Sequence, residues 1–179
     1  MNTAGAFSGL FQMIVSFYGF IVIARFMLQL SGADFYNPLS QGVVKATNIP
    51  LKWIRKAIPP TQRYDFACLV WLFVVYVILY AALGFFNIGG LLPLPTLVFM
   101  SFKGAVGALL SFWMITIFVS VIASWIAMGQ QNPALDLIHQ LTQPILGPIQ
   151  RVIPSAGGFD FSPIVALMAI MFLQTLFQL

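Results

Sequence analysis

Few residues in this chain can do chemistry, but two pairs of them recur at the same spacing. Lys56 lies nine positions before Asp65, and Arg151 lies nine positions before Asp160. An aspartate at the start of a membrane helix complements the positive end of the helix dipole. A cation paired with it would clamp the preceding loop against that helix, which is the arrangement we expect. A site that couples ions or protons and a set of solvated charges are the alternatives.

The residues needed for catalysis or metal binding are scarce. The chain contains no glutamate, and His139 is its single histidine. A zinc site takes three or four ligands, and a hydrolytic triad needs a base oriented by an acid. The glycines form no phosphate-binding loop. The single cysteine, Cys68, excludes an intramolecular disulfide and is expected to be a small apolar filler. We therefore expect no enzyme activity, no cofactor and no metal.

The elements that position the charged pairs are themselves repeated. Nine of thirty positions in 37–66 are identical in 132–161, at a constant offset of 95 residues. This internal match predicts a tandem duplication. The motif residues shared by the two copies include Asn37, Pro38, Thr47, Pro59 and Asp65 in the first copy, and Asn132, Pro133, Thr142, Pro154 and Asp160 in the second.

Each copy of the motif begins with a helix-start signal. Asparagine is a preferred N-cap, and proline is favoured at the first helical position. Apolar residues follow near helical spacing and are interrupted at Pro50 and Pro144. We therefore predict two short amphipathic helices in each loop, lying in the headgroup region of a membrane. An ordinary loop packed on helix ends is the alternative.

The composition predicts a membrane protein. Hydrophobic residues make up 60% of the chain and charged residues 7%, and the mean hydropathy is +0.97. Apolar stretches over about 7–30, 66–86, 104–128 and 161–179 predict four transmembrane helices, of which the last is the shortest. The first has neither the basic start nor the cleavage pattern of a signal peptide.

We thus predict an all-α membrane protein made of two parallel two-helix repeats. The first repeat covers 1–86 with its loop at 31–65, an external loop covers 87–103, and the second repeat covers 104–179 with its loop at 129–160.

The basic residues predict the orientation. Five of the eight lie between the first two stretches, which puts both long loops in the cytoplasm and both termini outside. The candidates for lipid or partner contact are Lys45, Lys52, Arg55, Lys56, Arg63 and Arg151. Arg25, near the end of the first span, is a membrane-embedded charge that we expect to extend toward the headgroups.

The doubled pattern of Asn-Pro, Thr, Ile-Pro and Asp-Phe between paired membrane spans resembles the YggT family of small bacterial and plastid membrane proteins. The resemblance covers about residues 7–179 and implies a multi-pass protein of the bacterial inner membrane. It also implies links to membrane-protein biogenesis, including cytochrome b maturation, to nucleoid distribution, and to osmotic or ion stress. Arg55-Lys56 in the first copy is replaced by Gln150-Arg151 in the second, so the two loops are not equally basic.

Two functions fit these features. We expect a non-enzymatic scaffold or assembly factor that contacts membrane lipids and either a protein partner or a second copy, without binding nucleic acid directly. The alternative is a component of ion or osmolyte transport, which is disfavoured because no charge is predicted near the middle of the membrane.

Small residues four apart in the third span predict close helix contacts at Gly104/Ala108, Gly107/Ser111 and Ser120/Ser124.

Overall fold

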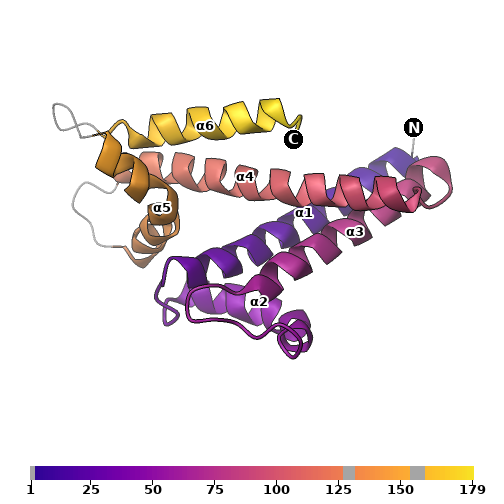
Figure 1. The fold of residues 1–179 in the computed structure, drawn as a ribbon, viewed down its shortest axis with the longest axis horizontal. Coiled ribbons are helices and arrows are strands. Elements are labelled where there is room, and N and C mark those ends of the chain that lie inside the picture. The colour runs from indigo at the N-terminus through magenta and orange to yellow at the C-terminus, as the bar shows by residue number, and fades with distance from the viewer. Residues whose placement is uncertain (1–2, 127–131, 154–159) are drawn as a thin grey trace.

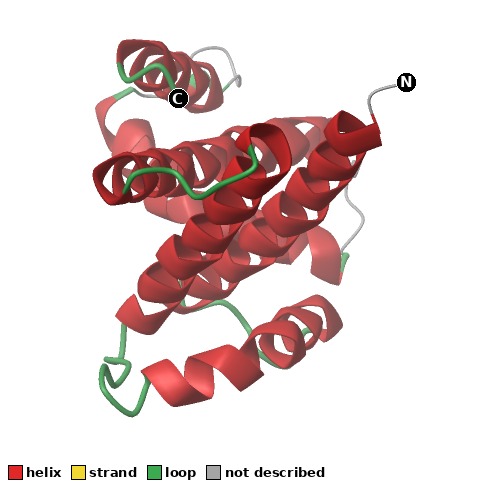
Figure 2. Cartoon of the chain, turned by 90° about the vertical axis from the view of Figure 1, so that its right-hand side faces the viewer, coloured by secondary structure: helices red, strands yellow, loops and turns green. Residues whose placement is uncertain are grey.

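The computed structural model describes residues 3–126, 132–153 and 160–179, and this part of the chain forms helices and no strands (Figure 2). The helices are α1 (Thr3–Leu30), α2 (Pro38–Ile54), α3 (Phe66–Ile88), α4 (Leu94–Ile126), α5 (Pro133–Val152) and α6 (Ser162–Leu176). Figure 1 shows α1 and α3 running together across α4, with α6 lying along α4. In chain order, α1, α2 and α3 are a long apolar helix, a less apolar helix that begins at a proline, and a second apolar helix. α4, α5 and α6 follow in the same order.

The prediction of four membrane-spanning helices is wrong for the last of them. Within the described residues, three helices are long and apolar enough to cross a membrane: Gly5–Leu30, Phe66–Ile88 and Leu94–Trp125. The fourth, α6, has 15 residues. At about 1.5 Å per residue it reaches roughly 22 Å, which is less than the ~30 Å of a hydrocarbon core. The chain turns after Leu176, where Phe177 donates its backbone N–H to Leu173 and the helix closes.

The predicted external loop at 87–103 is mostly helical. α3 continues to Ile88 and ends at Gly89, whose φ of +70° is the left-handed conformation that favours glycine. α4 then begins at Leu94, so it includes Lys103 and starts ten residues before the predicted position 104. Pro95 does not prevent this, because the first turn of a helix has no use for its missing N–H.

Each predicted pair of short loop helices is a single helix. α2 continues through Pro50, and α5 continues through Pro144 and Pro148. Proline removes one backbone hydrogen bond, which normally interrupts a helix. In α2, however, Thr47 and Leu51 on either side of Pro50 are both buried, so the two halves pack on the same surface. This continuous packing outweighs the lost hydrogen bond.

Buried side chains form two apolar clusters that share α4. The larger joins α1, α3 and α4 around Ile23, Leu72 and Phe112, with Leu51 from α2. The smaller joins α4, α5 and α6 around Ile117, Leu146 and Ile170. α4 is therefore the element on which both halves of the chain are built.

α3 side chains pack directly against the backbone of α4 at Gly104. A Cβ atom at this position would lie 2.7 Å from Cδ1 of Tyr76 and 2.8 Å from Cε2 of Tyr80, both on α3. Only glycine leaves room for the two rings. This confirms Gly104 as a close-contact position, although the contacting residues are large aromatic ones.

We expect Gly104→Ala to lower the free energy of unfolding by about 1–3 kcal/mol, because the added methyl group overpacks the interface. Gly9→Ala is the matched control, since a Cβ there meets nothing within 4 Å and alanine favours a helix. Denaturant titration of the purified variants in detergent measures both. An equal or smaller effect at Gly104 than at Gly9 would contradict the close approach.

Candidate functional site

The two Asn-Pro motifs cap their helices and also contact each other. The Asn37 Oδ1 atom accepts from the Leu39 N–H at 2.9 Å, and Asn132 Oδ1 accepts from the Ala134 N–H at 2.9 Å. The Asn37 side chain also donates to the Pro133 carbonyl at 2.8 Å. Pro38 and Pro133 are the first residues of α2 and α5. The repeated motif therefore joins the two loops, which explains its composition in structural terms.

The repeated threonines are also structural. Thr47 and Thr142 are fully buried. The Thr47 hydroxyl donates to the Val43 carbonyl at 2.8 Å, and the Thr142 hydroxyl donates to the His139 carbonyl at 3.0 Å. Each polar group is satisfied within its own helix, so a buried threonine packs without leaving a free donor.

A buried ion pair closes the first loop against α3. Asp65 is 0% exposed and directly precedes α3, and Arg55 follows the last residue of α2. Arg55 Nε donates to Asp65 Oδ2 at 3.2 Å, and Arg55 Nη2 makes a second, shorter bond to the same oxygen. The Cys68 thiol lies 3.3 Å from that oxygen. A clamp exists, but its cation is Arg55.

The predicted partner of Asp65, Lys56, lies elsewhere. Its ammonium group is 4.4 Å from the centre of the Trp53 ring, on the exposed side of the loop. The second predicted pair is also wrong: Gln150 donates to Asp160 Oδ2 at 2.9 Å, while Arg151 is exposed. Gln150 occupies the position equivalent to Arg55, so the contact is repeated but the charge is not.

Asp160 starts the second apolar helix without an ion pair. Its Oδ1 atom accepts from the backbone N–H of Ser162, the first residue of α6, at 2.9 Å. Burial raises the pKa of Asp160, but the hydrogen bonds from Ser162 and Gln150 outweigh it, so the pKa lies below its ordinary value. Because the pKa of Asp160 is lower in the folded state than in the unfolded state, its carboxylate stabilises the fold fully at pH values above the ordinary carboxyl pKa. This stabilisation is lost as the pH falls through the lowered pKa of the folded state.

Most of the loop cations predicted to contact lipid or a partner are exposed. Lys45, Lys52, Lys56, Arg63 and Arg151 are exposed, and Arg55 is half-buried in its ion pair. Pro59 is exposed after the end of α2, and Pro154 lies outside the described residues. Among the described residues, no group of three or more His, Cys, Asp or Glu side chains lies close enough together to hold a metal.

Arg25, the predicted membrane-embedded charge, is buried within the protein near the end of α1. Its side chain is 8% exposed, and its guanidinium carbon lies 5.2 Å from the centre of the Phe35 ring. It borders a cavity of about 440 Å³ at the end of α1. Burial of this cation was not foreseen, because the turn after α1 that covers it has no clear sequence signal.

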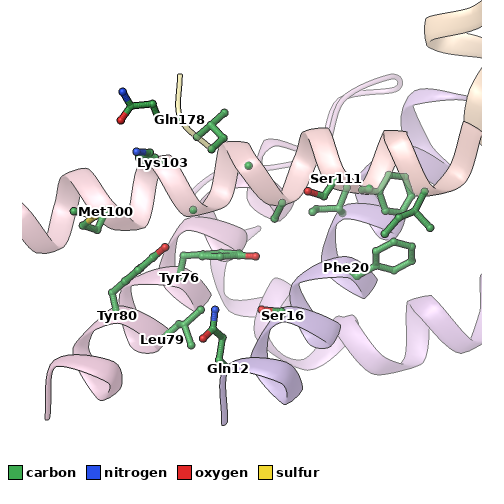
Figure 3. Close-up of a pocket in the computed structure, with 17 residues that line it drawn as sticks. Gln12, Ser16, Phe20, Tyr76, Leu79, Tyr80, Met100, Lys103, Ser111 and Gln178 are labelled. Atoms are coloured by element: carbon green, nitrogen blue, oxygen red, sulfur yellow. The ribbon is translucent and has the colours of Figure 1, made fainter. Parts of the chain in front are cut away.

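A second cavity, of about 540 Å³, lies between α1, α3, α4 and the C-terminal residues (Figure 3). The polar side chains that line it are Gln12, Ser16, Tyr76, Tyr80, Lys103, Ser111 and Gln178. Figure 3 shows the two tyrosines extending from α3 toward α4, with Lys103 on the α4 side. Lys103 was missed as a candidate because it was assigned to a loop. We call this space the polar vestibule.

The sequence is similar to those of other bacterial proteins. A family model described as CCB3/YggT matches residues 4–86 and 100–179. An uncharacterized protein of Pseudomonas aeruginosa is 37% identical, over 98% of this chain and 89% of its own. The uncharacterized protein YggT of Escherichia coli K12 is 32% identical, over 89% of this chain and 82% of its own. No solved structure matches significantly.

We expect Asp65→Asn to cost roughly 3–5 kcal/mol of unfolding free energy, because it leaves Arg55 without its buried partner. Asp160→Asn is the matched control and should cost at most about 1 kcal/mol, since that carboxylate is exposed. A double-mutant cycle with Arg55→Gln isolates the pair energy. Absence of coupling between positions 55 and 65, measured by denaturant titration in detergent, would contradict the clamp.

Proposed function

This chain belongs to the CCB3/YggT family, and from this membership we propose that it is a non-enzymatic membrane protein that assists the assembly of other membrane proteins. In this proposal it holds a transmembrane helix of a client while the client assembles. The observation that carries the proposal is an apolar groove between α3 and α4.

The groove consists of two adjoining hollows. One is lined by Leu69, Val70, Leu72, Phe73, Phe102, Ala105, Val106 and Leu109. The other is lined by Phe73, Leu94, Pro95, Val98, Phe99 and Phe102, so Phe73 and Phe102 belong to both. We call the combined surface the α3–α4 groove. Apart from a proline, its lining consists of aliphatic and aromatic residues.

The dimensions of the α3–α4 groove suit a helix. It extends along α4 from Leu94 to Leu109, which at about 1.5 Å per residue is roughly 22 Å. A helix in a membrane gains no hydrophobic driving force over lipid, so close packing into a hollow is what would favour its binding. Ala105 supplies a small side chain between the larger groove residues, where a second helix can approach.

We also propose that the protein has no enzyme activity. His139, the single histidine, lies 3.0 Å from the Gln143 side chain and is exposed. Asp65 and Asp160 are engaged at the starts of α3 and α6, and Asp34 accepts from the Tyr36 N–H. These acids hold local structure, and none is paired with the histidine as an acid–base couple.

The membrane setting is proposed from the helices and charges together. The three long apolar helices suit a bilayer, and the relatives are bacterial. We place the protein in the inner membrane with the basic α2 side in the cytoplasm and the amino terminus outside. The 15 residues of α6 are too few to cross the bilayer and would end within it.

Photo-crosslinking tests the client-binding proposal. A photoreactive phenylalanine analogue at Phe102, in the α3–α4 groove, should crosslink to other membrane proteins in native membranes. Phe118 is the matched control, because it is also a phenylalanine of α4, is 55% exposed against 62% for Phe102, and lies outside the groove. Protein adducts should be enriched at Phe102 over Phe118. Lipid adducts alone at both positions would contradict the proposal.

The polar vestibule supports transport as a second candidate. Polar groups inside a membrane bundle are costly and often mark a path for ions or solutes. Tyr76, about ten residues into α3, lies near the middle of that span, and Lys103 is half-buried nearby. In this function the vestibule would admit a small polar solute or ion between α1, α3 and α4.

Flux across liposome membranes tests the transport function. Purified protein should release trapped potassium or a neutral osmolyte faster than empty liposomes, and Tyr76→Phe should slow the release several-fold because it removes a hydroxyl from the vestibule. Tyr64→Phe is the control, since Tyr64 is exposed on the loop before α3. No flux above that of empty liposomes would remove transport as a candidate.

A further inference from the structure

We propose that the cavity at the end of α1 binds a phosphate-type anion, with Arg25 as the residue that binds it. The cavity has a volume of about 440 Å³ and is lined by Arg25, Gln29, Gly32, Ala33, Phe35 and Gln62. We call it the Arg25 cavity. It is distinct from both the polar vestibule and the α3–α4 groove, with which it shares no lining residue.

The charges around the cavity do not balance. Arg25 interacts electrostatically with Arg55, Cys68 and Asp65, which places two guanidinium groups and one carboxylate in the same region. Arg55 and Asp65 form the sole ion pair among the described residues. One buried positive charge is therefore left without a carboxylate. Buried charges in proteins are normally paired, so this charge calls for an anion.

Arg25 also lacks hydrogen-bond partners. Its Nη1 atom is buried and has no partner among the described residues. The nearby end of α1 does not supply one: the Met27 carbonyl accepts from the Ser31 N–H and hydroxyl, and the Leu28 carbonyl accepts from the Ala33 N–H. The Phe35 ring contacts the guanidinium group but cannot accept its hydrogen bonds as an anion does.

The lining suits a phosphate group. A guanidinium group donates two parallel hydrogen bonds to phosphate oxygens, which favours arginine over lysine in such sites. Gln29 is one turn beyond Arg25 and is held by a 2.7 Å bond from its amide to the Thr61 carbonyl. Gln62, from the adjoining loop, is exposed at the rim. No carboxylate is among the residues that line the cavity.

The phosphate group has two possible sources. The cavity lies at the polar end of a membrane-spanning helix, where lipid headgroups are found, and free phosphate reaches the same place from water. The chemistry of recognition is the same for both. The experiment therefore compares a phospholipid with inorganic phosphate.

Thermal unfolding in a neutral detergent at low salt provides the test. Phosphatidylglycerol, inorganic phosphate and diacylglycerol, which has acyl chains but no phosphate, are added separately to the full chain. Stabilisation by phosphatidylglycerol alone assigns the site to a lipid headgroup, and stabilisation by phosphate assigns it to the free anion. Stabilisation by none of them, or equal stabilisation by diacylglycerol, overturns the proposal.

Two variants connect the effect with the cavity. Gln62→Glu places a carboxylate at the exposed rim, so it should fold normally and weaken anion binding by at least about tenfold. Asn48→Asp, which adds a carboxylate on the exposed side of α2, is its control. Arg25→Gln should abolish the stabilisation, with Arg63→Gln as the control for a lost exposed cation. Unchanged binding by Gln62→Glu overturns the assignment even where Arg25→Gln fails to fold.

Discussion

The ion pair between Arg55 and Asp65 is the constraint on which the first half of the structure depends. Asp65 is fully buried at the point where the chain enters α3, and an unpaired carboxylate there would carry a large desolvation cost. Arg55 compensates this charge from the end of α2, so α2 must lie against the start of α3. The position of α2, in turn, places Leu51 in the core shared by α1, α3 and α4.

Each half of the chain has an aspartate just before its second apolar helix, but the two aspartates differ in their partner and in their burial. Gln150 takes the place of Arg55, and Asp160 is exposed where Asp65 is buried. A neutral amide is sufficient for an exposed carboxylate, because water already solvates it. The second half accordingly has the shorter apolar helix and the smaller core. The loss of one charge between the copies thus accompanies a smaller buried core among the described residues of the second half.

The sequence predicted the helical class, the starts of α2 and α5 and the first two membrane helices, because these follow from local signals. Asn37 and Asn132 cap their helices as expected, and α1 and α3 have the expected apolar length. Two positions were misleading. Pro50 would normally interrupt a helix, but it lies in a continuously buried face of α2. Gly104 was the predicted start of the third span, but α4 begins at Leu94 and Gly104 makes room for two tyrosines.

The candidate site was harder to predict, because its parts meet only in three dimensions. Spacing alone gave Lys56 as the partner of Asp65, one residue away from the true partner, since the direction of a side chain at a helix end depends on where the helix stops. Arg25 was recognised as an embedded charge, but its burial depends on the turn at Ala33 and Phe35. Lys103 was not a candidate because the sequence predicted a loop there, whereas α4 begins at Leu94 and includes it.

α3 borders the buried ion pair, the polar vestibule and the α3–α4 groove. Its first turn holds Asp65 and Cys68 beside the arginines, Tyr76 borders the polar vestibule, and Phe73 on another side lines the α3–α4 groove. A helix that displaced Phe73 would act on the same rigid element that carries Tyr76 and Asp65. Packed elements of this kind transmit displacement because their interiors are too dense to deform locally. A client helix in the groove, as proposed, would therefore contact the same helix that lines the polar vestibule.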